Sequence, residues 1–198
     1  IKKYYLEKPI DSLRREQVIG DKFTEASVRR VCDILMSSVE GDILVFLTGG
    51  ADIIKGCELL HNYLSHLVPI INNETYCITL SSSVTDEHEK FVTNEYLYKT
   101  NTEQAKKYDT KASGPFKRKI VFATEVAESS ITISGLKYVV DAGFAKQSKY
   151  YPLTNINALE KKYISKASHM QRQGRVGRTS PGECHCLFTE KEFKELFK

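Results

Sequence analysis

The sequence predicts an α/β fold in which a doubly wound, mainly parallel sheet is flanked by helices. Helical patterns alternate with short, continuous apolar runs, which gives a βαβ rhythm. Continuous apolar runs are typical of strands buried on both faces of a parallel sheet. The runs are Ile43–Leu47, Cys77–Leu80, Ile120–Ala123 and Tyr138–Val140. A length of 198 residues corresponds to one domain, residues 1–198, with room for a sizeable core.

The first two helices are defined by apolar spacing and by residues that start or stop helices. We expect Thr24 to cap the first helix and Gly41 to end it. Asp52 is expected to open the second helix. Their apolar positions recur at helical spacing: Val28, Val31, Cys32, Leu35 and Val39 in the first, and Ile53, Cys57, Leu60 and Leu64 in the second.

Two later helices carry clear start signals. Thr85-Asp86-Glu87 is expected to begin a helix that runs past Phe91. Thr189 and Glu192 have the spacing of a capping box, which predicts a last helix near the C-terminal end of the sequence.

Two stretches interrupt the βαβ rhythm. Residues 92–118 are polar and end in a basic run, so we expect a long surface insertion, partly helical around Glu103 to Lys107, without chemistry. Residues 144–164 alternate in polarity on either side of Pro152, which predicts a projecting antiparallel β-hairpin.

The composition limits the possible functions. A net charge of +4 permits nucleic-acid binding without requiring it. Five cysteines without framework spacing fit a reducing compartment. Cys184-His185-Cys186 lacks a second ligand pair and is followed by apolar residues, so we expect a strand there and no metal site. No apolar run approaches the ~18 residues of a membrane span. The chain begins at Ile1 rather than Met, so we expect it to be an excised piece.

The most informative segment is Gln171–Arg178. Read as a helix, it places Gln171, Arg175 and Arg178 on one face, with Gly174 and Gly177 leaving room for a ligand. Guanidinium groups suit phosphate oxygens. The alternative, a basic helix that faces solvent, is disfavoured because each glycine costs a helix about 1 kcal/mol. We therefore expect this segment to bind phosphate.

Hydroxyl groups gather where the predicted strands end. Ligands of doubly wound sheets bind beyond the carboxyl ends of the strands, and Thr48, Thr124 and Asp141 fall at or just after such ends. The segment Ala123–Ile133 is rich in hydroxyl and acidic residues and is suited to phosphate binding. A simple capped loop is an equally good interpretation.

Together these segments resemble a known family. Six segments have the order and spacing of that family's motifs. They are Phe46–Gly49, Ala123–Ile133, Val140–Phe144, Ile164–Ser168, Gln171–Arg178 and Pro181–Cys184. The pattern is similar to motifs IV, V and VI of the second RecA-like lobe of DEAH-box RNA helicases, which belong to superfamily 2. The resemblance covers nearly the whole chain and is weakest across residues 92–118.

The resemblance implies an ATP-driven motor on single-stranded RNA, with ATP bound between two lobes. Arg175 and Arg178 would be arginine fingers on the γ-phosphate, and Gln171 would position that phosphate and the attacking water. Phe91 matches an aromatic residue that stacks on adenine, although a core phenylalanine is an equal alternative. Ser134 stands where an acidic residue contacts the ribose, so that contact is weakened.

The resemblance also implies a set of RNA contacts. Thr124 and Thr132 match threonines that touch RNA phosphates, and Thr48 is a further phosphate contact. The hairpin lies near the RNA path in the family, where Lys146 and Lys149 would add attraction for the backbone. Arg172 points away from the ligand face and is expected to form an internal ion pair.

Three positions depart from the family pattern. Glu125 replaces an asparagine, and a carboxylate repels phosphate where an amide donates a hydrogen bond. Ser134 replaces an acidic residue, and Gly50 replaces a polar residue. The sequence therefore resembles a divergent member of the family whose arginine segment is intact.

The other half of an ATPase site is not in this sequence. It contains neither a phosphate loop of the form G-x-x-x-x-G-K-[ST] nor an Asp-Glu-x-His tetrapeptide. The resemblance assigns both, with the Mg²⁺ ligands, to an N-terminal RecA-like lobe of the same protein. We expect ATP with Mg²⁺, single-stranded RNA and an activating protein as partners, in the nucleus or the cytoplasm, with the nucleus favoured by the family.

Two alternatives remain at this stage. A catalytically silent RNA-binding or scaffold protein could keep this fold, and Glu125 and Ser134 slightly favour that interpretation. A viral DExH helicase is the other, but the Ser-Lys-Ala-Ser segment and Pro-Gly-Glu-Cys look cellular.

Overall fold

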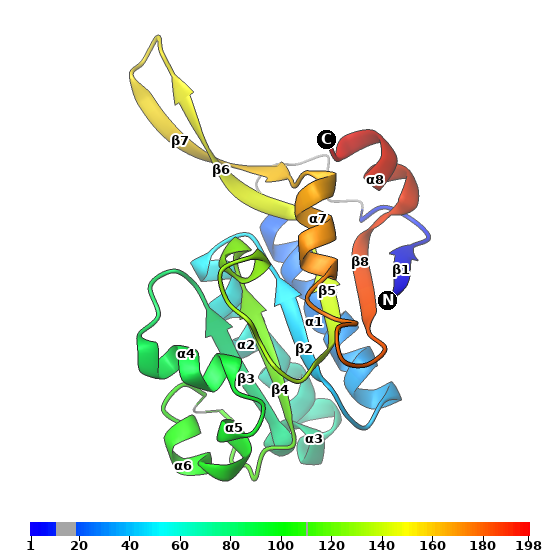
Figure 1. The fold of residues 1–198 in the computed structure, drawn as a ribbon, viewed down its shortest axis with the longest axis vertical. Helices are drawn as coiled ribbons and strands as arrows, with labels where there is room; N and C mark the ends of the chain where they lie inside the picture. The colour runs from blue at the N-terminus through cyan, green and yellow to red at the C-terminus, as the bar shows by residue number, and fades with distance from the viewer. Residues whose placement is uncertain (11–18, 110) are drawn as a thin grey trace.

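The fold is organised around a six-stranded sheet (Figure 1). The computed structural model describes residues 1–10, 19–109 and 111–198. All neighbouring strands of this sheet are parallel, which confirms the predicted doubly wound α/β class. In spatial order the strands are β1 (Lys2–Leu6), β8 (Glu183–Thr189), β5 (Leu136–Asp141), β2 (Asp42–Phe46), β4 (Arg118–Ala123) and β3 (Thr75–Leu80).

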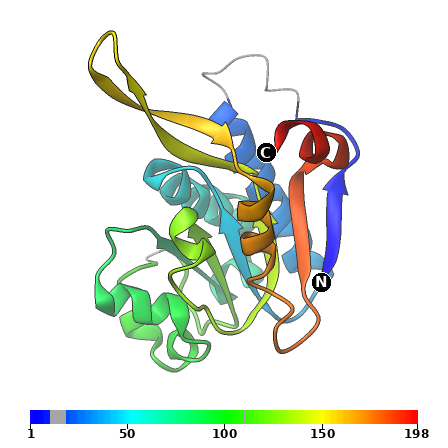
Figure 2. The same cartoon turned by 45° about the horizontal axis from the view of Figure 1, so that its top comes forward.

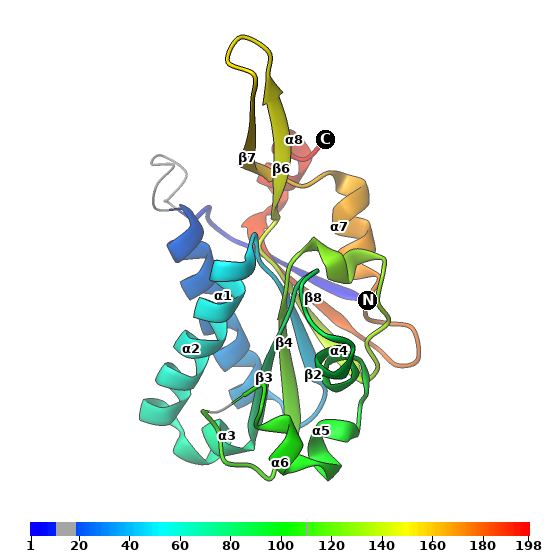
Figure 3. The ribbon, with the colours of Figure 1, turned by 90° about the vertical axis from the view of Figure 1, so that its left-hand side faces the viewer.

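Helices cover both faces of the sheet (Figure 3). One face carries α1 (Ile19–Ser37), α2 (Gly50–Leu67) and α3 (Pro69–Glu74). The other carries α4 (Asp86–Thr93), α7 (Lys166–Gln173) and the 3-10 helix η2 (Glu125–Glu128). Each face has its own buried apolar cluster, because continuous apolar strands leave both sides of the sheet to be covered.

The starts of the helices differ in how well the sequence predicts them. Thr85 caps α4 by accepting a hydrogen bond from the His88 backbone N–H, and Thr189 forms a complete capping box with Glu192 at the start of α8 (Glu190–Leu196). Both predictions are confirmed. Asp52 lies inside the first turn of α2, which begins two residues earlier after an N-cap, Gly49, that makes no side-chain bond.

The predicted limits of the first helix are wrong. Helix α1 begins at Ile19, so Thr24 is an internal, buried residue rather than a cap. The apolar pattern extends towards the N-terminus through Phe23, which is 6% exposed. The helix ends at Ser37, before the predicted stop at Gly41, and Val39 is 92% exposed instead of packing against the sheet.

The insertion at residues 92–118 is more structured than predicted. It contains α5 (Leu97–Thr100) and α6 (Thr102–Ala105), and Thr110 lies outside the described residues. Tyr98 and Phe116 are buried and pack on Tyr76 of β3, with ring centroids 5.4 and 4.9 Å away. The expected helical part near Glu103 is present as α6, but the segment is not a surface loop throughout, because two aromatic residues dock it on the sheet. The basic run ends in Arg118–Lys119, which is buried and opens β4.

The predicted β-hairpin is confirmed. Strands β6 (Phe144–Tyr151) and β7 (Ile156–Tyr163) pair antiparallel over their whole length. The hairpin projects from the body of the domain (Figure 2). Its base is buried at Phe144, whereas Leu153 at its tip is fully exposed.

The cysteines include a pair that the sequence pattern does not indicate. Cys57 of α2 and Cys77 of β3 form a disulfide, with Cα atoms 5.7 Å apart. The remaining cysteines, Cys32, Cys184 and Cys186, are free and buried. Within the described residues, every helix is too short or too polar to cross a membrane.

Candidate functional site

The Gln171–Arg178 segment is only partly helical. Helix α7 starts after Ser165, whose hydroxyl accepts from the Ser168 backbone N–H, and it ends at Gln173. Gly174 is the C-cap, and Gly177 has a positive φ of 76° that other residues rarely adopt. The expectation that one helical face carries all three polar residues is therefore wrong, because the helix ends before Arg175 and Gly177 turns the chain before Arg178.

Arg172 lies at the centre of a buried ionic network on the inner side of α7. Its side chain is 0% exposed. It donates to Glu128 Oε1 at 2.7 Å and to Asp141 Oδ1 at 2.8 Å. A further hydrogen bond reaches the Phe144 backbone oxygen at 3.2 Å. The predicted internal ion pair of Arg172 is confirmed.

The charges of this network stabilise one another. Burial alone would lower the pKa of Arg172, but Asp141 and Glu128 hold it above its usual value. Burial would likewise raise the pKa of Asp141, but Arg172 and His169 outweigh that effect and lower it. Since each charge has a bonded partner, the network joins α7, the end of β5, η2 and the start of the hairpin.

Arg175 has a different role in this structure. Its guanidinium donates to the backbone oxygens of Ile131, at 2.9 Å, and of Glu128. Burial, and then the charge of Arg178, lower the pKa of Arg175. The two guanidinium groups therefore repel each other, which favours an anion beside them.

Arg178 and Gln171 are exposed to solvent. The Arg178 side chain makes a single hydrogen bond within the described residues, from Nε to the Gly174 backbone oxygen at 3.1 Å. Its two terminal nitrogens are thus available to a ligand. Gln171 lies on the outer side of α7, next to the buried Arg172.

Several of the predicted RNA contacts lie at the carboxyl edge of the sheet. Thr48 follows β2, and its hydroxyl donates to Asp52 Oδ2 at 3.0 Å. Thr124 follows β4 and is 8% exposed. Lys146 lies near the base of the hairpin, and its ammonium packs against Gly49. A Cβ added to Gly49 would lie 2.7 Å from Lys146 Nζ. Lys149 lies further along β6, with its ammonium 4.9 Å from the centre of the Tyr151 ring.

The remaining predicted contacts line the segment between η2 and β5. Glu125 is exposed at the start of η2. Thr132 and Ser134 are exposed further along, and the Ser134 backbone N–H donates to the Thr93 backbone oxygen at the end of α4. The structure thus holds Ser134 beside α4, away from the carboxyl edge that carries Thr48.

Phe91 takes the core position that the alternative interpretation predicts. Its side chain is 4% exposed and belongs to the apolar cluster beneath α4, with its ring centroid 5.4 Å from that of Tyr108. Adenine stacking by Phe91 stays a prediction, and it requires this buried ring to become exposed.

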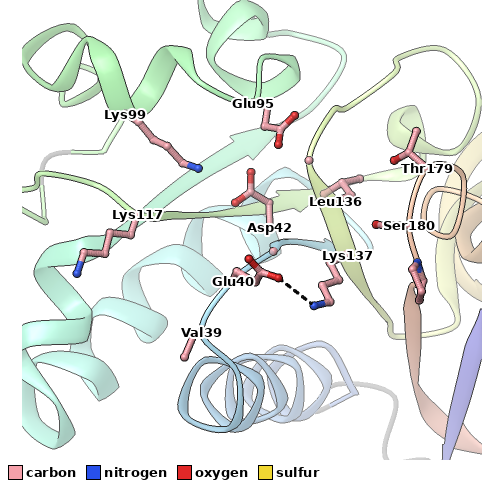
Figure 4. A pocket seen from close by; sticks show the side chains of 13 residues that line it. Val39, Glu40, Asp42, Glu95, Lys99, Lys117, Leu136, Lys137, Thr179 and Ser180 are labelled. Atoms are coloured by element: carbon pink, nitrogen blue, oxygen red, sulfur yellow. Dashed lines mark ion pairs between the residues drawn. The ribbon is translucent and has the colours of Figure 1, made fainter.

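A cavity of about 490 Å³ opens beside these segments. It is lined by Gly135, which follows Ser134, and by Thr179 and Ser180, which follow Arg178. Asp42 and Glu95 extend their carboxylates into it, and Lys99 reaches towards them (Figure 4).

The floor of this cavity is a buried carboxylate. Asp42 is 4% exposed, and its Oδ1 accepts from the Tyr98 hydroxyl and the Lys119 backbone N–H, both at 2.9 Å. Its Oδ2 has no hydrogen-bond partner within the described part of the chain. Burial raises the pKa of Asp42 more than the charge of Lys119 lowers it. Sequence reasoning missed this residue, because Asp42 only precedes an apolar run.

Comparison with known proteins identifies the family. A model described as the helicase conserved C-terminal domain matches residues 26–180. The chain belongs to this helicase family. It is 34% identical over 186 residues to the pre-mRNA-splicing factor ATP-dependent RNA helicase prp22 of Schizosaccharomyces pombe, covering 94% of this chain and 14% of that protein. The chain thus contains the conserved C-terminal domain of a helicase.

Solved helicases share the fold of this helicase domain. A structure of the Escherichia coli DExH-box NTPase HrpB matches with a TM-score of 0.71 at 24% identity. A structure described as the Escherichia coli DEAH/RHA helicase HrpB matches with a TM-score of 0.72 at 23% identity. Both matches cover 100% of this chain and 20% or 21% of the other. The domain thus spans about a fifth or less of the length of the proteins it matches.

Proposed function

We propose that this domain is the second motor lobe of an ATP-dependent DEAH-box RNA helicase and supplies one wall of its ATP site. The observation that carries the proposal is the pair Arg175 and Arg178 after α7. The two charges lie close enough for Arg178 to lower the pKa of Arg175, and the terminal nitrogens of Arg178 are free of bonds within the described residues. An incoming phosphate is the ligand that such a pair fits.

Arg178 is the stronger candidate for an arginine finger. Charge on the γ-phosphate oxygens must be offset in the transition state, and a guanidinium that is already in place does this at little cost. Gln171, exposed on the outer side of α7, positions the γ-phosphate and the attacking water. Ser134, beside the cavity, contacts the ribose.

Arg175 links the ATP side of the lobe to the RNA side. Its bonds to the Glu128 and Ile131 carbonyls hold the segment that leads to Thr132. When Arg175 turns to the γ-phosphate, these carbonyls lose their donor and the segment is released. ATP binding and RNA contact are coupled through this exchange of partners.

RNA binds by its phosphates along the carboxyl edge of the sheet and the segment after η2. Thr48, Thr124 and Thr132 supply hydroxyl groups, and Lys146 and Lys149 of the hairpin add positive charge. Glu125 repels phosphate and weakens this contact. The partner lobe supplies the phosphate loop and the Mg²⁺ ligands, and an activating protein completes the assembly. Since prp22 is named a pre-mRNA-splicing factor, we propose a nuclear role in RNA processing.

Replacing Arg178 with alanine in the full-length protein tests this proposal. RNA-stimulated ATP hydrolysis is expected to fall by roughly 10³- to 10⁵-fold, the usual effect of losing an arginine finger. RNA affinity, measured by fluorescence anisotropy, should change little. Arg29→Ala, on the opposite face of the sheet, is the matched control and should leave turnover intact. Normal turnover in Arg178→Ala would remove Arg178 from catalysis.

The isolated lobe provides a second test. Residues 1–198 alone should show no ATP hydrolysis, because the phosphate loop and the Mg²⁺ ligands belong to the other lobe. The assay is phosphate release with purified protein, with and without RNA. Measurable turnover that survives repurification refutes the assignment. A full-length protein that binds RNA without hydrolysing ATP instead establishes the silent RNA-binding alternative.

A further inference from the structure

A second cluster of reactive side chains lies behind α7, away from the exposed arginine. His169 of α7 and Cys184 and Cys186 of β8 place a ring nitrogen and two sulfurs within 4.8 Å of one another. All three side chains are buried, with exposed fractions of 0%, 0% and 2%. Among the described residues, this is the one such group of metal-ligand side chains.

The histidine is already oriented for metal binding. Its Nδ1 lies 2.7 Å from Asp141 Oδ2, and Asp141 is itself bonded to Arg172. Because that carboxylate accepts the Nδ1 proton, the lone pair of Nε2 faces the sulfurs, with Cys186 Sγ at 3.9 Å. A carboxylate on the far nitrogen is the usual second contact of a metal-binding histidine, where it fixes the ring and raises its basicity.

Strand geometry explains which residues take part. Cys184 and Cys186 are two apart on β8, so both point to the same side of the sheet. His185 between them points to the other side, where its ring stacks on Tyr4 at 4.8 Å and its Nε2 bonds to Glu183. The sequence triplet Cys-His-Cys is therefore not the ligand set, since the third ligand comes from α7.

We propose that His169 Nε2, Cys184 Sγ and Cys186 Sγ bind one thiophilic metal ion, Zn²⁺ or Cu(I). Two thiolates and an imidazole are a soft ligand set that selects these ions over Mg²⁺ or Ca²⁺. Binding releases the two thiol protons to solvent and forms two metal–sulfur bonds and one metal–nitrogen bond.

Zn²⁺ and Cu(I) differ in the number of ligands they need and in the charge that they leave at the site. Zn²⁺ neutralises both thiolates, which suits a buried position, but a four-coordinate zinc needs one more donor. Cu(I) is complete with three ligands and leaves one negative charge. Either ion links α7 to β8 beside Arg172 and so fixes the end of α7 from which Arg175 and Arg178 follow.

Metal content of the full-length protein tests the proposal. Protein purified under reducing conditions is loaded separately with Zn²⁺ and with Cu(I), desalted and measured by mass spectrometry of the elements. Cys184→Ser and Cys186→Ser are each expected to lose one equivalent of metal relative to the unaltered protein. Cys32→Ser, a free buried cysteine elsewhere, and His185→Asn, on the other side of β8, should retain it. Equal metal content in all five proteins overturns the proposal.

A measurement on the unaltered protein covers the case in which a variant fails to fold. Crystals of the loaded protein are measured on both sides of the zinc and copper absorption edges. An anomalous peak between His169 Nε2 and the two sulfurs is expected at one edge, and that edge identifies the ion. A map of the lobe without a peak there refutes the site. Neither readout depends on ATP hydrolysis, so the outcome is independent of the proposed motor function.

Discussion

Two arginines six residues apart have opposite environments in this domain. Arg172 is completely buried and bonded to two carboxylates. Arg178 is exposed, and its one described hydrogen bond is to a backbone oxygen. The same side chain thus supports the fold in one place and is available to a ligand in the other. The difference follows from where α7 ends, because the helix stops at Gln173 and Gly177, with its positive φ, redirects the chain before Arg178.

The two arginines separate a residue that stabilises the fold, Arg172, from a residue that is available to a ligand, Arg178. Removing Arg172 leaves Glu128 without its ion-pair partner and leaves the completely buried Asp141 with His169 as its remaining side-chain partner. Removing Arg178 leaves no buried group unpaired. Substitution of Arg172 should therefore lower stability, whereas substitution of Arg178 should lower ATP hydrolysis.

The largest effect on stability is expected for Arg172→Met. The free energy of unfolding should fall by about 3–5 kcal/mol, because Glu128 loses its ion-pair partner and the buried Asp141 keeps only His169 as a side-chain partner. Urea denaturation of residues 1–198 measures this change. Arg178→Met is the matched control and should change stability by less than about 0.5 kcal/mol. Equal stability of the two variants would show that the buried network contributes nothing.

Lys119 is a second buried cation, and it has fewer partners than Arg172. Its effect on stability should therefore depend on pH. It is 0% exposed, and burial lowers its pKa to about 8 despite the charge of Asp42. An unfolded lysine has a pKa of about 10.4, so above pH 8 the unfolded chain holds more protons than the folded one.

Stability should therefore rise with pH between about 8 and 10, by at most about 1.4 kcal/mol per pH unit from this group. Lys119→Met should remove that rise, which urea denaturation at several pH values measures. Arg118→Met, beside it on β4, should keep the rise because its group does not titrate in this range. An unchanged pH dependence in Lys119→Met would mean that Lys119 keeps its proton throughout.

The smallest effect is expected on the RNA side, at Glu125. Glu125→Gln removes an exposed negative charge next to Thr124, and RNA affinity should rise about fivefold, equivalent to about 1 kcal/mol for one charge pair in water. Fluorescence anisotropy at two salt concentrations measures it, and the gain should shrink at high salt. Glu58→Gln on α2 controls for net charge. Equal gains in both variants would place Glu125 away from RNA.

Much of the fold was predictable because it depends on local pattern. Four apolar runs predicted strands β2, β3, β4 and β5, and alternation predicted the β6–β7 hairpin. The edge strand β1 was harder, since Lys2–Leu6 has no continuous apolar run. The packing of residues 92–118 depends on where Tyr98 and Phe116 meet Tyr76, which sequence spacing does not reveal.

The sequence predicted which residues belong to the site better than it predicted how they are arranged in space. Gln171, Arg175 and Arg178 stood out by composition, but helical spacing placed them on one face, whereas α7 ends at Gln173, before the two arginines. The buried role of Arg172 was expected, while its partners Glu128 and Asp141 lie 44 and 31 residues away in sequence. The cavity above Asp42 and the His169–Cys184–Cys186 cluster arise only when distant elements meet.

The most direct test of the central claim is single-turnover ATP hydrolysis by the RNA-bound, full-length Arg178→Ala variant at saturating ATP. A residue that acts on the transition state lowers the rate even when the site is full. We predict a loss of about 10³-fold or more, with the thermal unfolding of the protein unchanged. A rate equal to that of the unaltered protein, or a loss that appears only together with unfolding, would contradict the account.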